Sequence, residues 1–163
     1  MTRNTMPPPI VLASTSIYRK ELLEKLGLPF IAQAPNFDEE PLKKSQALNP
    51  IDLAKALAAG KAKSLSTATN CVIGGDQLVA FAGKTLGKPK TLDKAKEQLL
   101  LLNGQTHELI TAVHIIYQGQ EYPILNVTQL HMRSLTEEQI EAYLQKDNPL
   151  DCAGSYKIEK SGL

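Results

Sequence analysis

The chain has 163 residues, of which 42% are hydrophobic and 21% charged, and its formal net charge is +1. This size and hydrophobic content predict one globular domain with its own core and exclude an intrinsically disordered chain. The small net charge excludes the extended basic surface of a duplex-binding protein, so we expect no nucleic-acid partner.

The sequence contains no run of about 20 apolar residues, the length that a membrane-spanning helix needs. Its first residues also lack the apolar segment of a secretory signal peptide. These features predict a cytoplasmic protein without a membrane partner. Cys71 and Cys152 are the only cysteines, and because they show no metal-ligand spacing we expect two reduced thiols.

Residues 1–9 end in three prolines and are predicted to form a flexible tail, with the domain starting at Ile10. The apolar run Ile10–Ala13 predicts a buried strand, and the leucines that follow at helical spacing predict a helix closed by Gly27. A strand at Phe30–Ala34 and a polar loop at Pro35–Ser45 are expected next.

The rest of the chain continues the alternation of helices and strands. Pro50 opens a helix with a helical apolar period, and Cys71–Asp76 is predicted to be a buried strand that ends in an acid. The further predicted elements are a hairpin at 77–86, a helix at 92–103, a pair of strands at 109–117 and 122–132, and a helix capped by Thr136 and Gln139. The pattern predicts a mixed sheet covered by helices.

Hydroxyls and cations gather where the first strand passes into the first helix. Ser16 precedes this helix, and Arg19 and Lys20 lie in its first turn, where the partial positive charge of a helix N-terminus disfavours cations. A phosphate held by the hydroxyls, the open N–H groups and the guanidinium would resolve this conflict. The alternative is structural: Ser16 caps the helix and the cations point into water.

Asp76 follows an apolar run and two glycines, which predicts a carboxylate at the end of a buried strand. Ligands of open α/β sheets bind beyond the carboxyl ends of the strands, and glycines allow a ligand to approach closely. The position therefore indicates an acid that faces a ligand. The alternative is an aspartate that caps the next turn.

Three more charged residues are candidates for the same site. Lys61 follows Gly60 in an Ala-rich helix, and Lys88 follows a short strand; either lysine can also be an ordinary surface residue. Glu39 belongs to an acidic cluster on a predicted loop. Such a cluster is a solvated face unless it joins a hard cation, because Mg²⁺ binds one or two carboxylates together with phosphate oxygens.

Five segments resemble, in order and spacing, the motifs of the Maf family. They are Leu12–Arg19, Asp38–Glu39, Ile73–Gln77, Gly87–Pro89 and Cys152–Glu159. The resemblance extends from Ile10 to Leu163 and implies a hydrolase that cleaves the α–β phosphoanhydride of a nucleoside triphosphate. It implies Asp76 as the catalytic base, and Glu39 with Asp76 as ligands of Mg²⁺ or Mn²⁺. The substrate-binding residues that it implies are Ser16, Arg19, Lys61 and Lys88.

Asp76-Gln77 and the ending Ser155-Tyr156-Lys157-x-Glu159 resemble the family branch that hydrolyses 7-methyl-GTP. The dTTP/UTP branch typically carries Asp-Thr and a final Gln. By this resemblance Tyr18, Gln77 and Glu159 contact the base, because a carboxylate matches the paired N–H donors of guanine and an aromatic ring suits a cationic base. The chain departs from that branch at Ile17, Tyr18 and Gly75, and a dTTP/UTP pyrophosphatase remains an alternative.

The resemblance also implies an α/β fold, similar to that of Maf and ITPase proteins, in which a mixed twisted sheet is flanked by helices and two lobes surround a central cleft. A homodimer is implied as well. Similar family members continue past Leu163 through another strand and helix, so the domain at 10–163 is expected to lack both. A second alternative is a nucleotide-binding regulator of cell division or septum formation with little turnover, since Maf relatives have been linked to septum inhibition.

Overall fold

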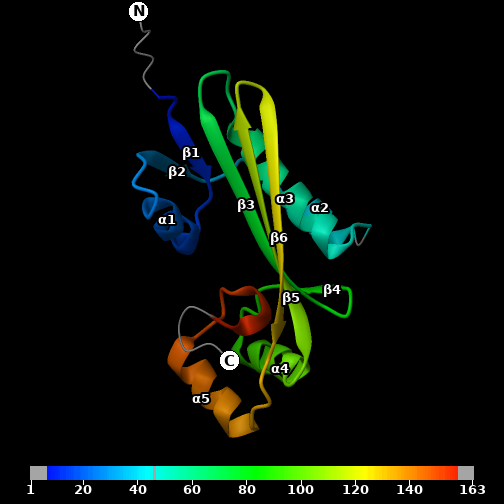
Figure 1. The fold of residues 1–163 in the computed structure, drawn as a ribbon. Coiled ribbons are helices and arrows are strands. Elements are labelled where there is room, and N and C mark those ends of the chain that lie inside the picture. The colour runs from blue at the N-terminus through cyan, green and yellow to red at the C-terminus, as the bar shows by residue number, and fades with distance from the viewer. Residues whose placement is uncertain (1–6, 46, 158–163) are drawn as a thin grey trace, which may run out of the picture. The chain divides into compact units, whose positions relative to one another are not determined.

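The computed structural model describes residues 7–45 and 47–157, so Glu159 and residues 1–6 of the predicted tail lie outside the described residues (Figure 1). The elements are β1 (Ile10–Ala13), α1 (Ile17–Glu24), β2 (Phe30–Gln33), α2 (Glu40–Lys44), α3 (Pro50–Leu65), β3 (Cys71–Phe81), β4 (Lys84–Leu86), α4 (Leu92–Leu102), β5 (Thr106–Tyr117), β6 (Gln120–His131), α5 (Glu137–Asp147) and a 3-10 turn at Ala153–Ser155. Within the described ranges, no helix has both the length and the apolar character required to cross a membrane.

The six strands form one mixed sheet, which confirms the predicted fold class. Its main path runs β2-β1-β3-β5-β6, and β4 pairs with β3. β1 is parallel to both of its neighbours, whereas β4 is antiparallel to β3. Because Ala13 lies opposite Gly74 in this register, the chain that leaves β1 starts toward α1 beside Gly75 and Asp76.

The chain divides into two compact units, in agreement with the two predicted lobes. Unit 1 comprises Met1–Asp76 and Ala112–Leu125, and unit 2 comprises Gln77–Thr111 and Asn126–Leu163. Each unit has a buried apolar cluster of its own. The cluster of unit 1 contains Val11, Ala13, Ala62, Val72 and Ile116. The cluster of unit 2 is built on side chains of β3, α4 and α5, among them Val79, Leu99, Leu102, Ile140 and Leu144.

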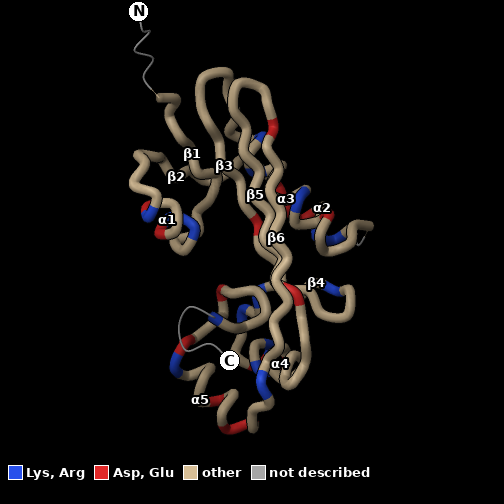
Figure 2. Tube along the Cα trace, viewed as in Figure 1, with Lys and Arg blue, Asp and Glu red and all other residues tan. Residues whose placement is uncertain are grey.

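The predicted loop at Pro35–Ser45 is wrong in part, because it contains the five-residue helix α2. Ion pairs at helical i, i+4 spacing explain this turn of helix. Lys43 pairs with Glu39 and Lys44 with Glu40, and Figure 2 shows acidic and basic residues next to one another along α2. Such pairs each stabilise a helix by about 0.2–0.5 kcal/mol. The loop was predicted from the polar composition of the segment, which does not reveal this contribution.

The predicted strand end at Asp76 is also wrong. β3 continues through Asp76 to Phe81, so this carboxylate lies in the middle of an 11-residue strand. The residues from Leu78 to Ala80 are buried and extend the apolar run beyond Asp76. A buried carboxylate inside a strand requires a partner, and the structure provides one from another element.

Candidate active site

Asp76 is a buried acid, only 7% exposed, on the part of β3 that belongs to unit 1. Its partner is Lys61 of α3, whose ammonium lies 2.6 Å from the Asp76 carboxylate. Lys61 is itself 6% exposed, which excludes the alternative of an ordinary surface lysine. Two opposite charges share a desolvated position, where ion pairs are common only if their hydrogen-bonding capacity is satisfied.

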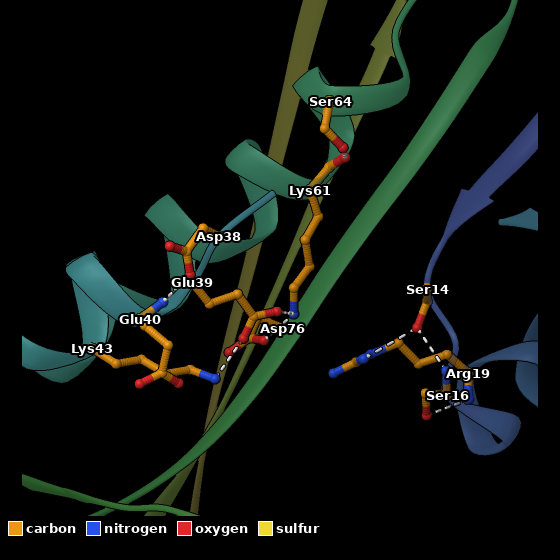
Figure 3. Close-up of polar contacts among 10 residues, drawn as sticks. All are labelled: Ser14, Ser16, Arg19, Asp38, Glu39, Glu40, Lys43, Lys61, Ser64 and Asp76. Carbon is orange, nitrogen blue, oxygen red and sulfur yellow. Dashed lines mark hydrogen bonds and ion pairs between the residues drawn. The ribbon is translucent and has the colours of Figure 1, made fainter. Parts of the chain in front are cut away.

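Glu39 completes a three-residue cluster. Its Oε1 lies 2.9 Å from the Lys61 ammonium, so one lysine bridges two carboxylates, and its Oε2 accepts a hydrogen bond from Lys43. Figure 3 shows Glu39 and Asp76 converging on the end of the Lys61 side chain. The acidic cluster at 38–40 is therefore more than a solvated face, because one of its members is turned toward a buried cation.

Two glycines bring these three side chains together. A Cβ on Gly74 would lie 2.3 Å from the carbonyl oxygen of Ala58, so only glycine allows α3 to pack this closely on β3. A Cβ on Gly60 would lie 2.3 Å from the ring of Phe37, two residues before Glu39. Both distances are far below a van der Waals contact of about 3.5–4.0 Å. Gly74 thus places Lys61 against β3, and Gly60 seats the segment that carries Glu39.

The cations around Glu39 determine its ionisation. Burial on its own would raise the pKa of Glu39, but hydrogen bonds from Lys43 and Lys61 and the charges of both lysines outweigh it and hold the pKa below the ordinary value of 4.5. Glu39 therefore stays ionised near neutral pH.

One cation of the first helix, Arg19, lies beside the residue that precedes Asp76. Arg19 reaches back from α1, and a Cβ on Gly75, the residue before Asp76, would be 3.5 Å from its Nε. Its Nη1 donates to the hydroxyl of Ser14 at 3.4 Å, and Figure 3 shows the side chain extending from α1 toward β3. The guanidinium and the Asp76 segment are thus neighbours in unit 1.

Ser16 has the structural role that the sequence offered as the alternative to phosphate binding. It is the N-cap of α1, and its hydroxyl accepts a weak hydrogen bond from the Arg19 backbone N–H at 3.4 Å. Capping uses one acceptor of a hydroxyl that also has a donor, so Ser16 keeps the capacity to donate to an anion. Its contact with substrate stays a prediction.

The remaining predicted residues lie on other segments of the chain or outside the described residues. Tyr18 is half-buried on α1 in unit 1. Gln77 and Lys88 belong to unit 2; Gln77 is exposed and its amide donates to Thr111 at 2.9 Å, while Lys88 is exposed on the loop after β4. Glu159 lies outside the described residues.

Two residues of the site had no role assigned from the sequence. Ser14 is 6% exposed, and its hydroxyl contacts both the Ser16 N–H and Arg19. Lys43 shares Glu39 with Lys61. The spacing of four residues between Glu39 and Lys43 is a signal that could have identified the second pair.

The arrangement favours binding of a polyanion together with a cation. Two carboxylates face one ammonium, and an arginine lies beside Gly75, the residue before Asp76. In the described part of the chain, no three His, Cys, Asp or Glu side chains are grouped so that they could hold a metal ion. Two carboxylates still meet the needs of Mg²⁺ or Mn²⁺ when phosphate oxygens of a ligand supply further positions. The donor set therefore fits a metal that binds together with a phosphate-bearing ligand.

Known proteins are similar to this chain over most of its length. The family model described as Maf-like protein matches residues 9–163. A protein of Bdellovibrio bacteriovorus named 7-methyl-GTP pyrophosphatase is 50% identical over 94% of this chain and 81% of its own length. Proteins of the same name from Syntrophotalea carbinolica and Nitrosococcus oceani are 42% and 41% identical and are covered over 79% of their lengths. The Ham1 structure of Staphylococcus aureus matches at 13% identity with a TM-score of 0.49, covering 76% of this chain and 71% of its own; a likeness at that level supports no inference.

Proposed function

This chain belongs to the family of Maf-like proteins, which matches it over residues 9–163, and we propose that it is a nucleoside triphosphate pyrophosphatase whose preferred substrate is 7-methyl-GTP. The products are the nucleoside monophosphate and pyrophosphate. The observation that carries the proposal is the buried cluster in which Lys61 bridges Asp76 and Glu39. The choice of base rests on relatives that are named 7-methyl-GTP pyrophosphatases.

The charges of unit 1 suit a triphosphate. The guanidinium of Arg19 can form paired hydrogen bonds with phosphate oxygens. Lys61 supplies a second cation, and the first turn of α1 adds N–H groups and a partial positive charge. Lys88 is proposed as a further phosphate ligand on the basis of its motif, and its exposed side chain on a short loop is compatible with that role.

Asp76 is proposed to orient a water molecule and to accept its proton as the water oxygen attacks the α-phosphorus. The bond between the α-phosphorus and the bridging oxygen then breaks, and pyrophosphate leaves with that oxygen. No covalent enzyme intermediate is required. Lys61, held 2.6 Å from Asp76, is close enough to the same centre to stabilise charge that develops on the phosphates.

A divalent cation, Mg²⁺ or Mn²⁺, would be held by Glu39 and Asp76 and would neutralise phosphate charge when bound. Its oxygen ligands from the protein would be the same two carboxylates that Lys61 bridges in this structure. With such a cation bound to the two carboxylates, the Lys61 ammonium would be available to the phosphates instead.

The base is proposed to be recognised by Tyr18, Gln77 and Glu159. A carboxylate accepts both N–H groups of the guanine edge, and an aromatic ring attracts the positive charge of 7-methylguanine. A homodimer and a cytoplasmic location remain predictions from the sequence.

The proposal is tested by pyrophosphate release from 7-methyl-GTP, GTP, UTP and dTTP in the presence of Mg²⁺ or Mn²⁺. The highest kcat/KM is expected for 7-methyl-GTP. A preference for UTP or dTTP would move the chain to the other branch of the family. Tight nucleotide binding without release of pyrophosphate would instead support the regulatory alternative.

A further inference from the structure

Gln98, a half-buried residue of α4, is in contact with two of the five motifs of this chain. Its Oε1 accepts a hydrogen bond from the Ser155 hydroxyl at 2.5 Å. Its Nε2 donates to the carbonyl oxygen of Gly87 at 3.0 Å. Ser155 belongs to the motif at 152–159 and Gly87 to the motif at 87–89, and all three residues lie in unit 2. One amide group therefore links two loops that are 68 residues apart in the chain (155 minus 87).

The loop that carries Lys88 has no regular structure of its own and is held at several points. Pro89 is buried, and the Lys90 N–H donates to the carbonyl oxygen of Leu150 at 3.2 Å. Lys90 has a φ of 65°, a left-handed conformation that non-glycine residues rarely adopt. Lys88 is exposed and lies between these fixed points. The hydrogen bond from Gln98 holds Gly87, the residue directly before Lys88.

The second loop is fixed even more firmly. Ser155 is fully buried and has a φ of 64°, a conformation that persists only where the surroundings hold it. Gly154 also has a positive φ, and a Cβ there would lie 2.9 Å from a methyl group of Val79. The next residue, Tyr156, bonds to His107 at 2.9 Å. A buried hydroxyl requires a partner, and Gln98 is the partner of Ser155.

We infer that Gln98 is a positioning residue: it holds the Lys88 loop against the Ser155 loop, and through Gly87 it sets where the Lys88 ammonium meets the phosphates. The inference rests on the proposed function for the identity of the anion. A glutamine suits the task because a single amide accepts from the serine and donates to the carbonyl at the same time. Neither a carboxylate nor an apolar side chain of this length can do both.

The test is a double-mutant cycle of Gln98→Met and Lys88→Ala. It is read out by the affinity for inorganic tripolyphosphate with Mg²⁺ and by KM and kcat for 7-methyl-GTP. Gln98→Met alone should weaken tripolyphosphate binding by about 5- to 20-fold and raise KM more than it lowers kcat, whereas in the Lys88→Ala background it should change affinity by less than about 2-fold. Effects that add independently would overturn the inference, as would a Gln98→Met protein that loses thermal stability but keeps its affinity.

Gln98→Glu separates the two contacts and serves as the second variant if Gln98→Met does not fold. It retains an acceptor for Ser155 and loses the donor to Gly87, so its affinity should fall as in Gln98→Met; wild-type affinity would contradict the inference. Glu97→Gln, an exposed change one residue earlier on α4, is the matched control and should have no effect. If the wild type binds tripolyphosphate but releases no pyrophosphate from the nucleotide, the proposed function fails. The tripolyphosphate affinities of the double-mutant cycle then still show whether Gln98 positions Lys88. A wild type that binds no tripolyphosphate overturns both.

Discussion

Replacing Lys61 with methionine tests the cluster that holds the two carboxylates. Methionine keeps most of the side-chain length but removes the ammonium, and it leaves Asp76 and Glu39 facing each other. The side chains of Lys61 and Asp76 are 8% and 9% exposed, so water cannot replace the lost partner. Breaking a buried pair by removing one member costs about 3–5 kcal/mol. Because Glu39 is 25% exposed, we expect the lower end of that range.

A loss of about 3 kcal/mol corresponds to a fall in Tm of about 6–12 °C for a domain of this size. The measurement is calorimetric or urea unfolding in a chelator, followed by the same measurement with Mn²⁺. Because the two freed carboxylates can then ligate the metal without displacing an ammonium, Mn²⁺ should restore part of the loss, by about 2.7 kcal/mol when its concentration is 100 times its Kd. The wild type should be stabilised less by the same metal concentration.

Lys43→Met is the matched control, because Lys43 pairs with the same Glu39 but its side chain is 44% exposed. Removal of such a surface pair costs at most about 1 kcal/mol. If Lys61→Met is no less stable than Lys43→Met, the buried bridge does not stabilise the fold. If Mn²⁺ stabilises the wild type and Lys61→Met equally, the ammonium and the metal do not compete for the carboxylates.

Three further predictions concern catalysis, base choice and pH dependence. Asp76→Asn should lower kcat by about 100- to 10,000-fold while nucleotide binding survives; near-normal turnover in a steady-state assay would exclude Asp76 as the base. Glu159→Gln should lower the kcat/KM ratio of 7-methyl-GTP to UTP by about 5- to 150-fold, since one guanine N–H then faces another donor, and an unchanged ratio would show that Glu159 does not contact the base. Burial raises the pKa of Tyr156 from 10.0 to about 12, so its stabilising contribution is present below pH 10 and is lost as the pH rises toward 12. Urea unfolding at about pH 9 and about pH 11 should show a steeper loss of stability in the wild type than in Tyr156→Phe, and parallel losses would contradict the raised pKa.

The local segments were predictable because they depend on neighbouring residues. The buried strand β1, the capping box of Thr136 and Gln139, and the turn at Gln118–Gly119 between β5 and β6 all follow from short patterns in the sequence. The Thr136 cap forms with both of its reciprocal hydrogen bonds. Periodicity and capping preferences act over a few residues, so a single sequence contains them.

The sequence allowed the residues of the candidate site to be named, but not their arrangement. Asp76, Lys61 and Glu39 were each identified, but not that one lysine bridges both acids. That contact depends on the fit of α3 against β3 at Gly74 and of Phe37 against Gly60, which are distances between segments far apart in the chain. The same limit explains the error at Asp76. A charged residue is expected to end a buried strand unless another residue pairs with it. Lys61 pairs with Asp76 in this way, and the sequence alone does not show that contact.

The central claim, that water attacks the α-phosphorus and pyrophosphate leaves, is tested most directly by hydrolysis of 7-methyl-GTP in water enriched in heavy oxygen. Mass spectrometry of the two products shows which of them has taken up the label. Attack at the α-phosphorus predicts that the heavy oxygen is in the nucleoside monophosphate and that the pyrophosphate is unlabelled. Label in the pyrophosphate would mean attack at the β-phosphorus and would contradict the mechanism.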